Sequence, residues 1–160
     1  MIRWTPAGAV STPQTVQIRV QQRYPGRIQA GAPLPTRSLS PEELADNIRY
    51  FTAGLRTPRT TPCTTLVLSG VGVARRPDTP GALALARSEG ITRAILHAGL
   101  DDLAALPVQD FAGSVDLLVV PIRGAPESAT AAILLAHEAG LCVCANVVLT
   151  TQTTPHIADI

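Results

Sequence analysis

Short apolar runs alternate with amphipathic stretches along most of this chain. Apolar runs predict strands at residues 66–68, 91–97, 115–122 and 141–149, and the nearly continuous run at 115–122 predicts a central strand buried on both faces. Apolar positions at helical spacing predict helices between them, such as residues 127–139, which end at Gly140. This alternation indicates an α/β fold, with a parallel sheet of about five strands joined by right-handed crossover helices.

The segment from residue 62 to residue 102 shows this alternation most clearly. In order, it contains a strand (66–68), a glycine-rich turn (69–72), a helix (79–89) and a second strand (91–97). Asp78 or Thr79 is the expected N-cap of the helix. Such a succession predicts a βαβ unit, and the loops that follow its strands are where parallel folds usually place a ligand.

The N-terminal part of the chain is less regular. Residues 1–14 show no period and are expected to form an irregular arm, which leaves residues 15–160 as a single domain. Residues 15–20 alternate between polar and apolar, which predicts a half-exposed strand or a strand at the edge of the sheet. Residues 21–39 are expected to form a long loop, and residues 100–106 a short helical turn.

A helix that begins near residue 40 has a complete N-terminal signature. Ser40 is the expected N-cap, Pro41 fits the first helical position, and Glu43 completes a capping box. The buried stripe of this helix is predicted at Leu44, Ile48, Phe51 and Leu55.

The composition is that of a globular protein without a broad charged surface. Apolar residues make up 46% of the 160 residues and charged residues 16%, which is enough to form one core. The formal net charge is +1, all the basic residues are arginine, and aromatic residues are scarce, so we expect no nucleic-acid binding. We also expect no membrane association, because no apolar run approaches the roughly 20 residues of a membrane span.

The cysteines and the N-terminus indicate a cytoplasmic protein. No hydrophobic stretch typical of a signal peptide occurs near Met1. Cys63, Cys142 and Cys144 lie in or beside apolar strands, so we expect reduced thiols that pack as small buried hydrophobic residues.

Several segments follow one another in an order that resembles a known family. They are LVLSG, RRPDTPGALALARSEGI, AILHAGLDDL, VDLLVVPIRG and AHEAGLCVCANVVLTTQT. The order resembles that of the radical S-adenosylmethionine (radical SAM) enzymes, which fold as partial (βα)6 barrels. The resemblance extends from Val16 to Ile160 and implies an incomplete TIM-like barrel, in which the family's sixth strand would follow Ile160.

The same resemblance places the family's catalytic motifs on residues that lack the required chemistry. The three cysteines that hold the family's [4Fe–4S] cluster correspond to Tyr24, Ile28 and Gly31, and none of these is a thiol. The motif that receives the amino group of the cofactor corresponds to residues 70–73, where the carboxylate is missing. We therefore expect no cluster, and the first hypothesis is a non-catalytic binding or assembly subunit.

Polar and glycine residues at the ends of the expected strands are candidates for ligand binding. They are Ser69, Gly70, Gly72, His97 and Arg123. Glycines leave the backbone open to close approach, and arginine suits phosphate or carboxylate groups. The second hypothesis is a cluster-free enzyme or sensor that binds S-adenosylmethionine, a nucleotide or another anion. Tight turns alone would also explain the glycines, and the absence of lysine excludes a P-loop.

His97 is the most interesting ionisable residue in the sequence. It ends a strand near Asp101 and Asp102, so one hypothesis is a general base oriented by an aspartate. The preferred interpretation is structural, with His97 bonded to a neighbouring loop and the two aspartates as N-caps of the following turn. His137 is expected to interact with the C-terminal dipole of its own helix.

The last expected strand predicts association with another chain. Residues 143–149 are apolar, and a strand of this kind at the end of a sheet leaves backbone groups unpaired. We expect a homo-oligomer or a tight complex with another protein subunit to cover this edge and the adjoining sheet face.

Overall fold

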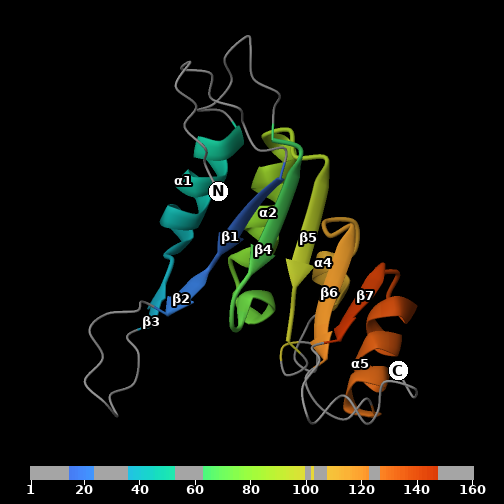
Figure 1. Cartoon of the computed structure of the whole chain (residues 1–160). Coiled ribbons are helices and arrows are strands. Elements are labelled where there is room, and N and C mark those ends of the chain that lie inside the picture. The colour runs from blue at the N-terminus through green and yellow to red at the C-terminus, as the bar shows by residue number, and fades with distance from the viewer. Residues whose placement is uncertain are drawn as a thin grey trace, which may run out of the picture.

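The computed structural model describes residues 15–23, 36–52, 63–99, 102, 108–122 and 127–147. Its main feature is a five-stranded, all-parallel sheet with the order β1-β4-β5-β6-β7 (Figure 1). The strands are Thr15–Arg19 (β1), Thr65–Ser69 (β4), Arg93–His97 (β5), Leu117–Ile122 (β6) and Val143–Val147 (β7). The predicted α/β class and parallel sheet are therefore confirmed. Within the described residues the sheet is open, with β1 at one end and β7 at the other.

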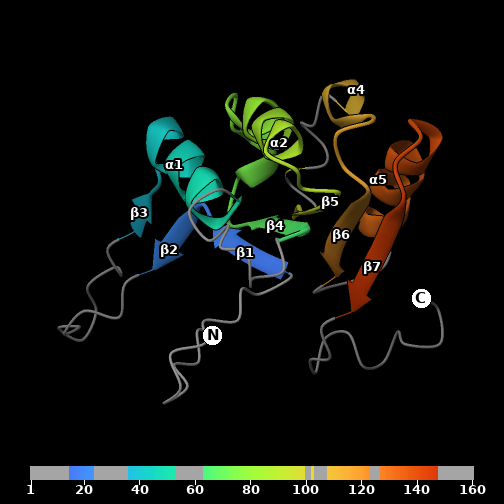
Figure 2. The same ribbon diagram turned by 90° about the horizontal axis from the view of Figure 1, so that it is seen from above.

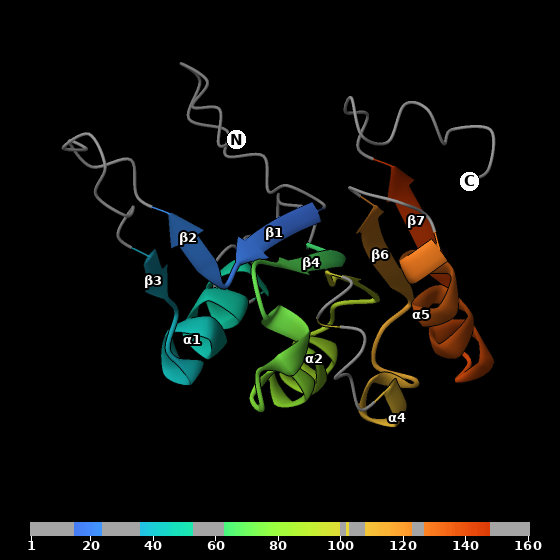
Figure 3. The same ribbon diagram turned by 90° about the horizontal axis from the view of Figure 1, so that it is seen from below.

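The described helices lie along one side of this sheet. They are Pro41–Thr52 (α1), Thr79–Ser88 (α2), the short Val108–Phe111 (α4) and Glu127–Glu138 (α5), with a 3-10 turn at Val73–Arg75 (η1). Figures 2 and 3 show α1, α2 and α4 on the same side of the strands, and α5 packs against β7. No helix in the described part of the chain is long and apolar enough to cross a membrane.

The hydrophobic core lies between the strands and these helices. Alternate residues of the strands point into it, including Leu66, Leu68, Ala94, Leu96, Leu118 and Val120, which are all at most 1% exposed. Leu44, Ile48, Leu83, Phe111 and Ala136 complete the core from the helices. In β1 only Val16 and Ile18 are buried, so the prediction of a half-exposed strand at the sheet edge is confirmed.

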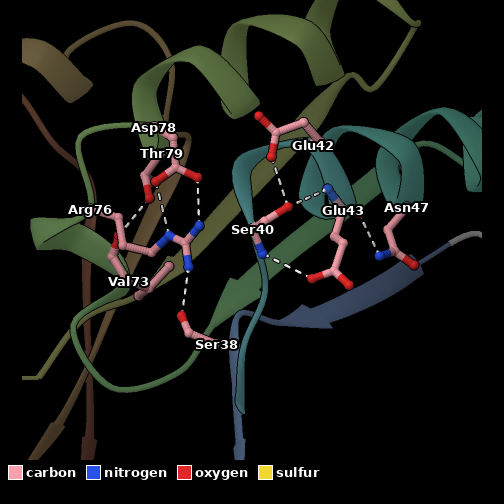
Figure 4. Close-up of polar contacts among 9 residues, drawn as sticks. All are labelled: Ser38, Ser40, Glu42, Glu43, Asn47, Val73, Arg76, Asp78 and Thr79. Atoms are coloured by element: carbon pink, nitrogen blue, oxygen red, sulfur yellow. Dashed lines mark hydrogen bonds and ion pairs between the residues drawn. The ribbon is translucent and has the colours of Figure 1, made fainter.

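The predicted capping box opens α1 as expected (Figure 4). The Glu43 amide donates to Ser40 Oγ at 3.2 Å, and the Ser40 amide donates to Glu43 Oε2 at 2.9 Å. Two backbone donors at the helix start are thereby satisfied reciprocally. Leu44 and Ile48 of the predicted stripe are buried, and Leu55 lies outside the described residues.

Asp78 does not cap α2 with its side chain, which corrects one of the two predicted caps. Its carboxylate is engaged instead by Arg76, at 3.0 Å from Nε and 2.6 Å from Nη2 (Figure 4). This bidentate contact holds the pKa of Asp78 below its ordinary value. Thr79 Oγ1 donates to the Val73 carbonyl at 2.6 Å, and Arg76 Nη1 reaches Ser38 Oγ at 2.9 Å.

The predicted long loop at residues 21–39 contains two strands. Gln21–Arg23 (β2) and Thr36–Ser38 (β3) pair in antiparallel fashion, which corrects the prediction at both ends of the segment. Helix α4 was likewise not predicted, and of the helical turn expected at residues 100–106 only Asp102 lies within the described residues. The expected arm at residues 1–14 lies outside them.

Candidate functional site at the carboxyl ends of the strands

The carboxyl end of β4 combines a buried hydroxyl with a glycine turn. Ser69 is 6% exposed, and its Oγ accepts a hydrogen bond from Gln17 Nε2 of β1 at 3.0 Å. The chain then turns through Gly70 and Gly72, which have φ angles of 130° and 71°. Side-chain-bearing residues rarely adopt such angles, so the turn itself accounts for both glycines. The structural explanation of these two predicted site residues is thus sufficient.

His97 ends the neighbouring strand β5 at the same level as Ser69. Leu68 of β4 pairs with Leu96 of β5, so the next residues of the two strands lie side by side. Burial lowers the pKa of the His97 imidazole below its ordinary value. Within the described part of the chain no carboxylate and no loop group is bonded to this ring, so neither the aspartate-oriented base nor the predicted bond to a loop is formed there.

Asp102 joins the loops that follow β4 and β5. Its carboxylate is buried; Oδ1 pairs with Arg75 Nε at 2.8 Å, and Oδ2 accepts a hydrogen bond from the Gly99 amide at 3.4 Å. The predicted N-cap role is therefore replaced by a contact between two loops. The contact between Arg75 and Asp102 could have been predicted from the sequence, because the loops that follow consecutive strands of a βαβ unit lie at the same edge of the sheet. Asp101 lies outside the described residues.

Removing the Asp102 carboxylate is expected to destabilise the protein. Asp102→Ala leaves the Gly99 amide and the Arg75 guanidinium without this acceptor, at a cost of about 1–3 kcal/mol. Asp46→Ala is the matched control, because Asp46 pairs with Arg49 on the surface of α1 and exposed pairs contribute about 0–1 kcal/mol. Urea unfolding measures both costs, and equal costs for the two variants would contradict the role of Asp102.

The environment of His97 predicts a specific pH dependence. Because burial lowers the pKa of His97 in the folded state, the unfolded chain takes up this proton first as the pH falls below about 6.5. The contribution of His97 to stability is therefore full above pH 6.5 and declines below it. In His97→Gln, we expect a shallower fall in the free energy of unfolding between pH 7 and pH 5. An unchanged slope would show that the ring is not desolvated.

The cysteines differ in their surroundings. Cys63 is buried as predicted, and desolvation raises the pKa of its thiol. Cys142 and Cys144 are exposed, which corrects the prediction that all three pack as buried hydrophobic residues. Cys144 pairs with Val119 of β6, between the core-facing pairs of the two strands, so its side chain points to the sheet face that carries no described helix. No group of three or more potential metal ligands occurs among the described residues.

The remaining predicted site residues cannot be placed. Tyr24, Ile28 and Gly31, which correspond to the family's cluster cysteines, lie outside the described residues, as does Arg123. A groove of about 500 Å³ lies elsewhere, lined by Leu39, Glu43, Asp46, Asn47 and Tyr50. This groove is formed by α1 and by Leu39, which precedes the helix, and none of the predicted site residues lines it.

Comparison with known proteins adds no family assignment. No protein-family model matches the chain, and no curated protein matches its sequence. The resemblance to radical SAM enzymes therefore stays a prediction, and function has to be argued from the geometry of the sheet and its edges.

Proposed function

We propose that this chain is a non-catalytic binding or assembly subunit that uses strand β7 to pair with another chain, in the first instance a second copy of itself. The observation that carries the proposal is the position of β7 at the end of the described sheet, where no described strand pairs with its outer edge. The non-catalytic part rests on the sequence, in which Tyr24, Ile28 and Gly31 replace the thiols that the family resemblance requires.

The hydrogen-bond pattern identifies the backbone groups that face outward from β7. Leu118 of β6 pairs with Val143, and the Leu118 amide donates to the Cys142 carbonyl at 2.8 Å. In a parallel ladder, the residue between two bonded residues points its N–H and C=O away from the neighbouring strand. The amides and carbonyls of Val143, Ala145 and Val147 therefore form the free edge of the described sheet.

This edge lacks the features that usually prevent edge-to-edge pairing. Natural edge strands are often protected by a charged residue, a proline or a bulge. The sequence of β7, VCANV, contains no charge and no proline, and its five residues pair with β6 in continuous register. By contrast, β1 at the opposite end of the sheet carries Arg19 in an exposed position.

Exposed apolar side chains on a neighbouring helix support the same interface. Leu134 and Leu135 of α5 are 52% and 54% exposed, and α5 packs against β7 (Figure 1). These two adjacent leucines place exposed apolar surface next to β7, and exposed apolar patches are common at interaction sites. If the partner is a second copy, its β7 strand would add to this edge and extend the sheet. Its α5 helix would then lie near these leucines.

Proline at position 145 tests the proposal. The Ala145 amide faces away from β6, so Ala145→Pro removes a free-edge donor without breaking the β6 ladder. Ala145→Val is the matched control, because it keeps the amide and has higher strand propensity. Molar mass from light scattering over a wide dilution series is expected to show a dimer for the wild type and for Ala145→Val, and a monomer for Ala145→Pro. A wild type that stays monomeric without a co-purifying partner would exclude this function.

A further inference from the structure

Three side chains with hydrogen-bond donors lie in one row across the carboxyl ends of neighbouring strands. Arg19 of β1 pairs with Ser69 of β4, and the Leu68–Leu96 pair places His97 of β5 level with Ser69. Parallel strands lie about 4.8 Å apart, so the three α-carbons span roughly 10 Å. These residues alternate with the core positions, and they therefore point to the sheet face on which no described helix lies (Figures 2 and 3).

Within the described residues, the donor groups of this row have no acceptor. Ser69 Oγ accepts from Gln17 Nε2 at 3.0 Å, which fixes the hydroxyl and leaves its own hydrogen to be donated. Ser69 is 6% exposed, and no acceptor for this hydrogen occurs among the described residues. In the same described part of the chain, Arg19 has no ion pair and His97 no hydrogen bond. The oxygen of Ser69 is therefore satisfied by Gln17, and its hydrogen is available to the acceptor oxygen of a ligand.

The charge of this face favours an anion. The outward positions of β1, β4 and β5 carry no aspartate or glutamate. Guanidinium, hydroxyl and imidazole groups donate from three adjacent strands. The two oxygens of a carboxylate can both be bound by a single guanidinium. A phosphate presents three oxygens in different directions, so it matches donors from three strands better.

We infer that Arg19, Ser69 and His97 bind the phosphate group of a small molecule at the carboxyl edge of the sheet. This site is separate from the β7 edge, and its occupation does not depend on assembly. The guanidinium supplies the opposite charge, the Ser69 hydroxyl supplies a donor already oriented by Gln17, and one imidazole N–H completes the set.

Titration with inorganic phosphate and with AMP, followed by ¹⁵N NMR and calorimetry, tests this inference. We expect saturable binding, with the largest shifts at the amides of Arg19, Ser69 and His97. Loss of one charge-assisted hydrogen bond weakens binding about tenfold or more, so Ser69→Ala and Arg19→Gln should both show this loss. Arg49→Gln, which removes an exposed arginine from α1, should bind as the wild type does.

The outcomes separate the possible ligands from a failed site. Tighter binding of AMP than of inorganic phosphate would identify a nucleotide as the source of the phosphate, and equal binding would identify the phosphate alone as the recognised group. Absence of saturable binding of both probes at millimolar concentration would overturn the inference. So would equal affinity for the wild type and Arg19→Gln, a variant at an exposed position that leaves the core intact. The molar mass of the protein is unaffected in either case, so failure here is distinguishable from failure of the assembly proposal.

Discussion

Leu96→Ala is expected to lower the free energy of unfolding by about 2–5 kcal/mol. Leu96 is fully buried in β5, the middle strand of the described sheet, where strands lie on both sides and helices cover the face. Removal of its side chain leaves a cavity that the neighbouring strands cannot collapse to fill, because both are fixed by their ladders. Urea unfolding monitored by circular dichroism measures the effect.

The adjacent residue provides the control for Leu96. Ile95 lies next to it on the same strand, points to the opposite face and is only partly buried. Ile95→Ala removes a side chain of the same size from the adjacent position of the strand. We expect it to lower the free energy of unfolding by less than half as much as Leu96→Ala does. Equal costs would mean that the two faces of the sheet are equally covered, contrary to the single layer of described helices.

Phe111→Ala is expected to cost about 3–5 kcal/mol. Phe111 is 1% exposed and is the largest fully buried side chain of the core, although it belongs to the four-residue helix α4. Phe111 belongs to the same buried cluster as the core residues of the strands and helices, so its loss removes apolar contact from the core. Thermal or urea unfolding measures the change.

Tyr50→Ala is the control for the loss of an aromatic ring. Tyr50 is 57% exposed on α1, where its ring makes a T-shaped contact with that of Phe51, with ring centroids 5.3 Å apart. Surface substitutions of this kind usually change stability by about 0.5 kcal/mol or less. If Phe111→Ala were no more destabilising than Tyr50→Ala, α4 would not be part of the core.

Local features of the fold could be predicted from the sequence. The parallel sheet follows from apolar runs that alternate with helical spacing, and the start of α1 follows from Ser40 and Glu43, which are three residues apart. In both cases the deciding interactions join residues that are close in sequence, so pattern and spacing contain the information.

Contacts between distant segments could not be predicted in the same way. The β2–β3 pair joins the two ends of a long segment with no apolar alternation, and the four residues of α4 are too few to show a helical period. The exposure of Cys144 depends on which face of the sheet the helices cover, and the sequence of the strand alone does not state this. Asp78 was predicted as a cap from its position, but the neighbouring Arg76 competes for its carboxylate.

The residues of the candidate site divide in the same way, into those that the sequence predicts and those that it does not. Ser69 and His97 were predicted from their places at strand ends, and the parallel register brings them level with each other. The contributions of Gln17 and Arg19 and the contact of Asp102 with Arg75 were not predicted, because each joins strands or loops that are close in space but distant in sequence. The radical SAM resemblance rests on the order of elements, and it stays a prediction because neither comparison tests it.

Hydrogen exchange along β7, resolved for single residues by NMR, tests the proposed assembly most directly. The amides of Cys144 and Asn146 point toward β6 and are expected to be protected at every protein concentration, which makes them an internal control. The amides of Val143, Ala145 and Val147 point away from β6, so pairing with another chain should protect them at high concentration and release them on dilution. If these three amides exchange rapidly at every concentration while Cys144 and Asn146 stay protected, the β7 edge carries no partner strand and the proposed function is wrong.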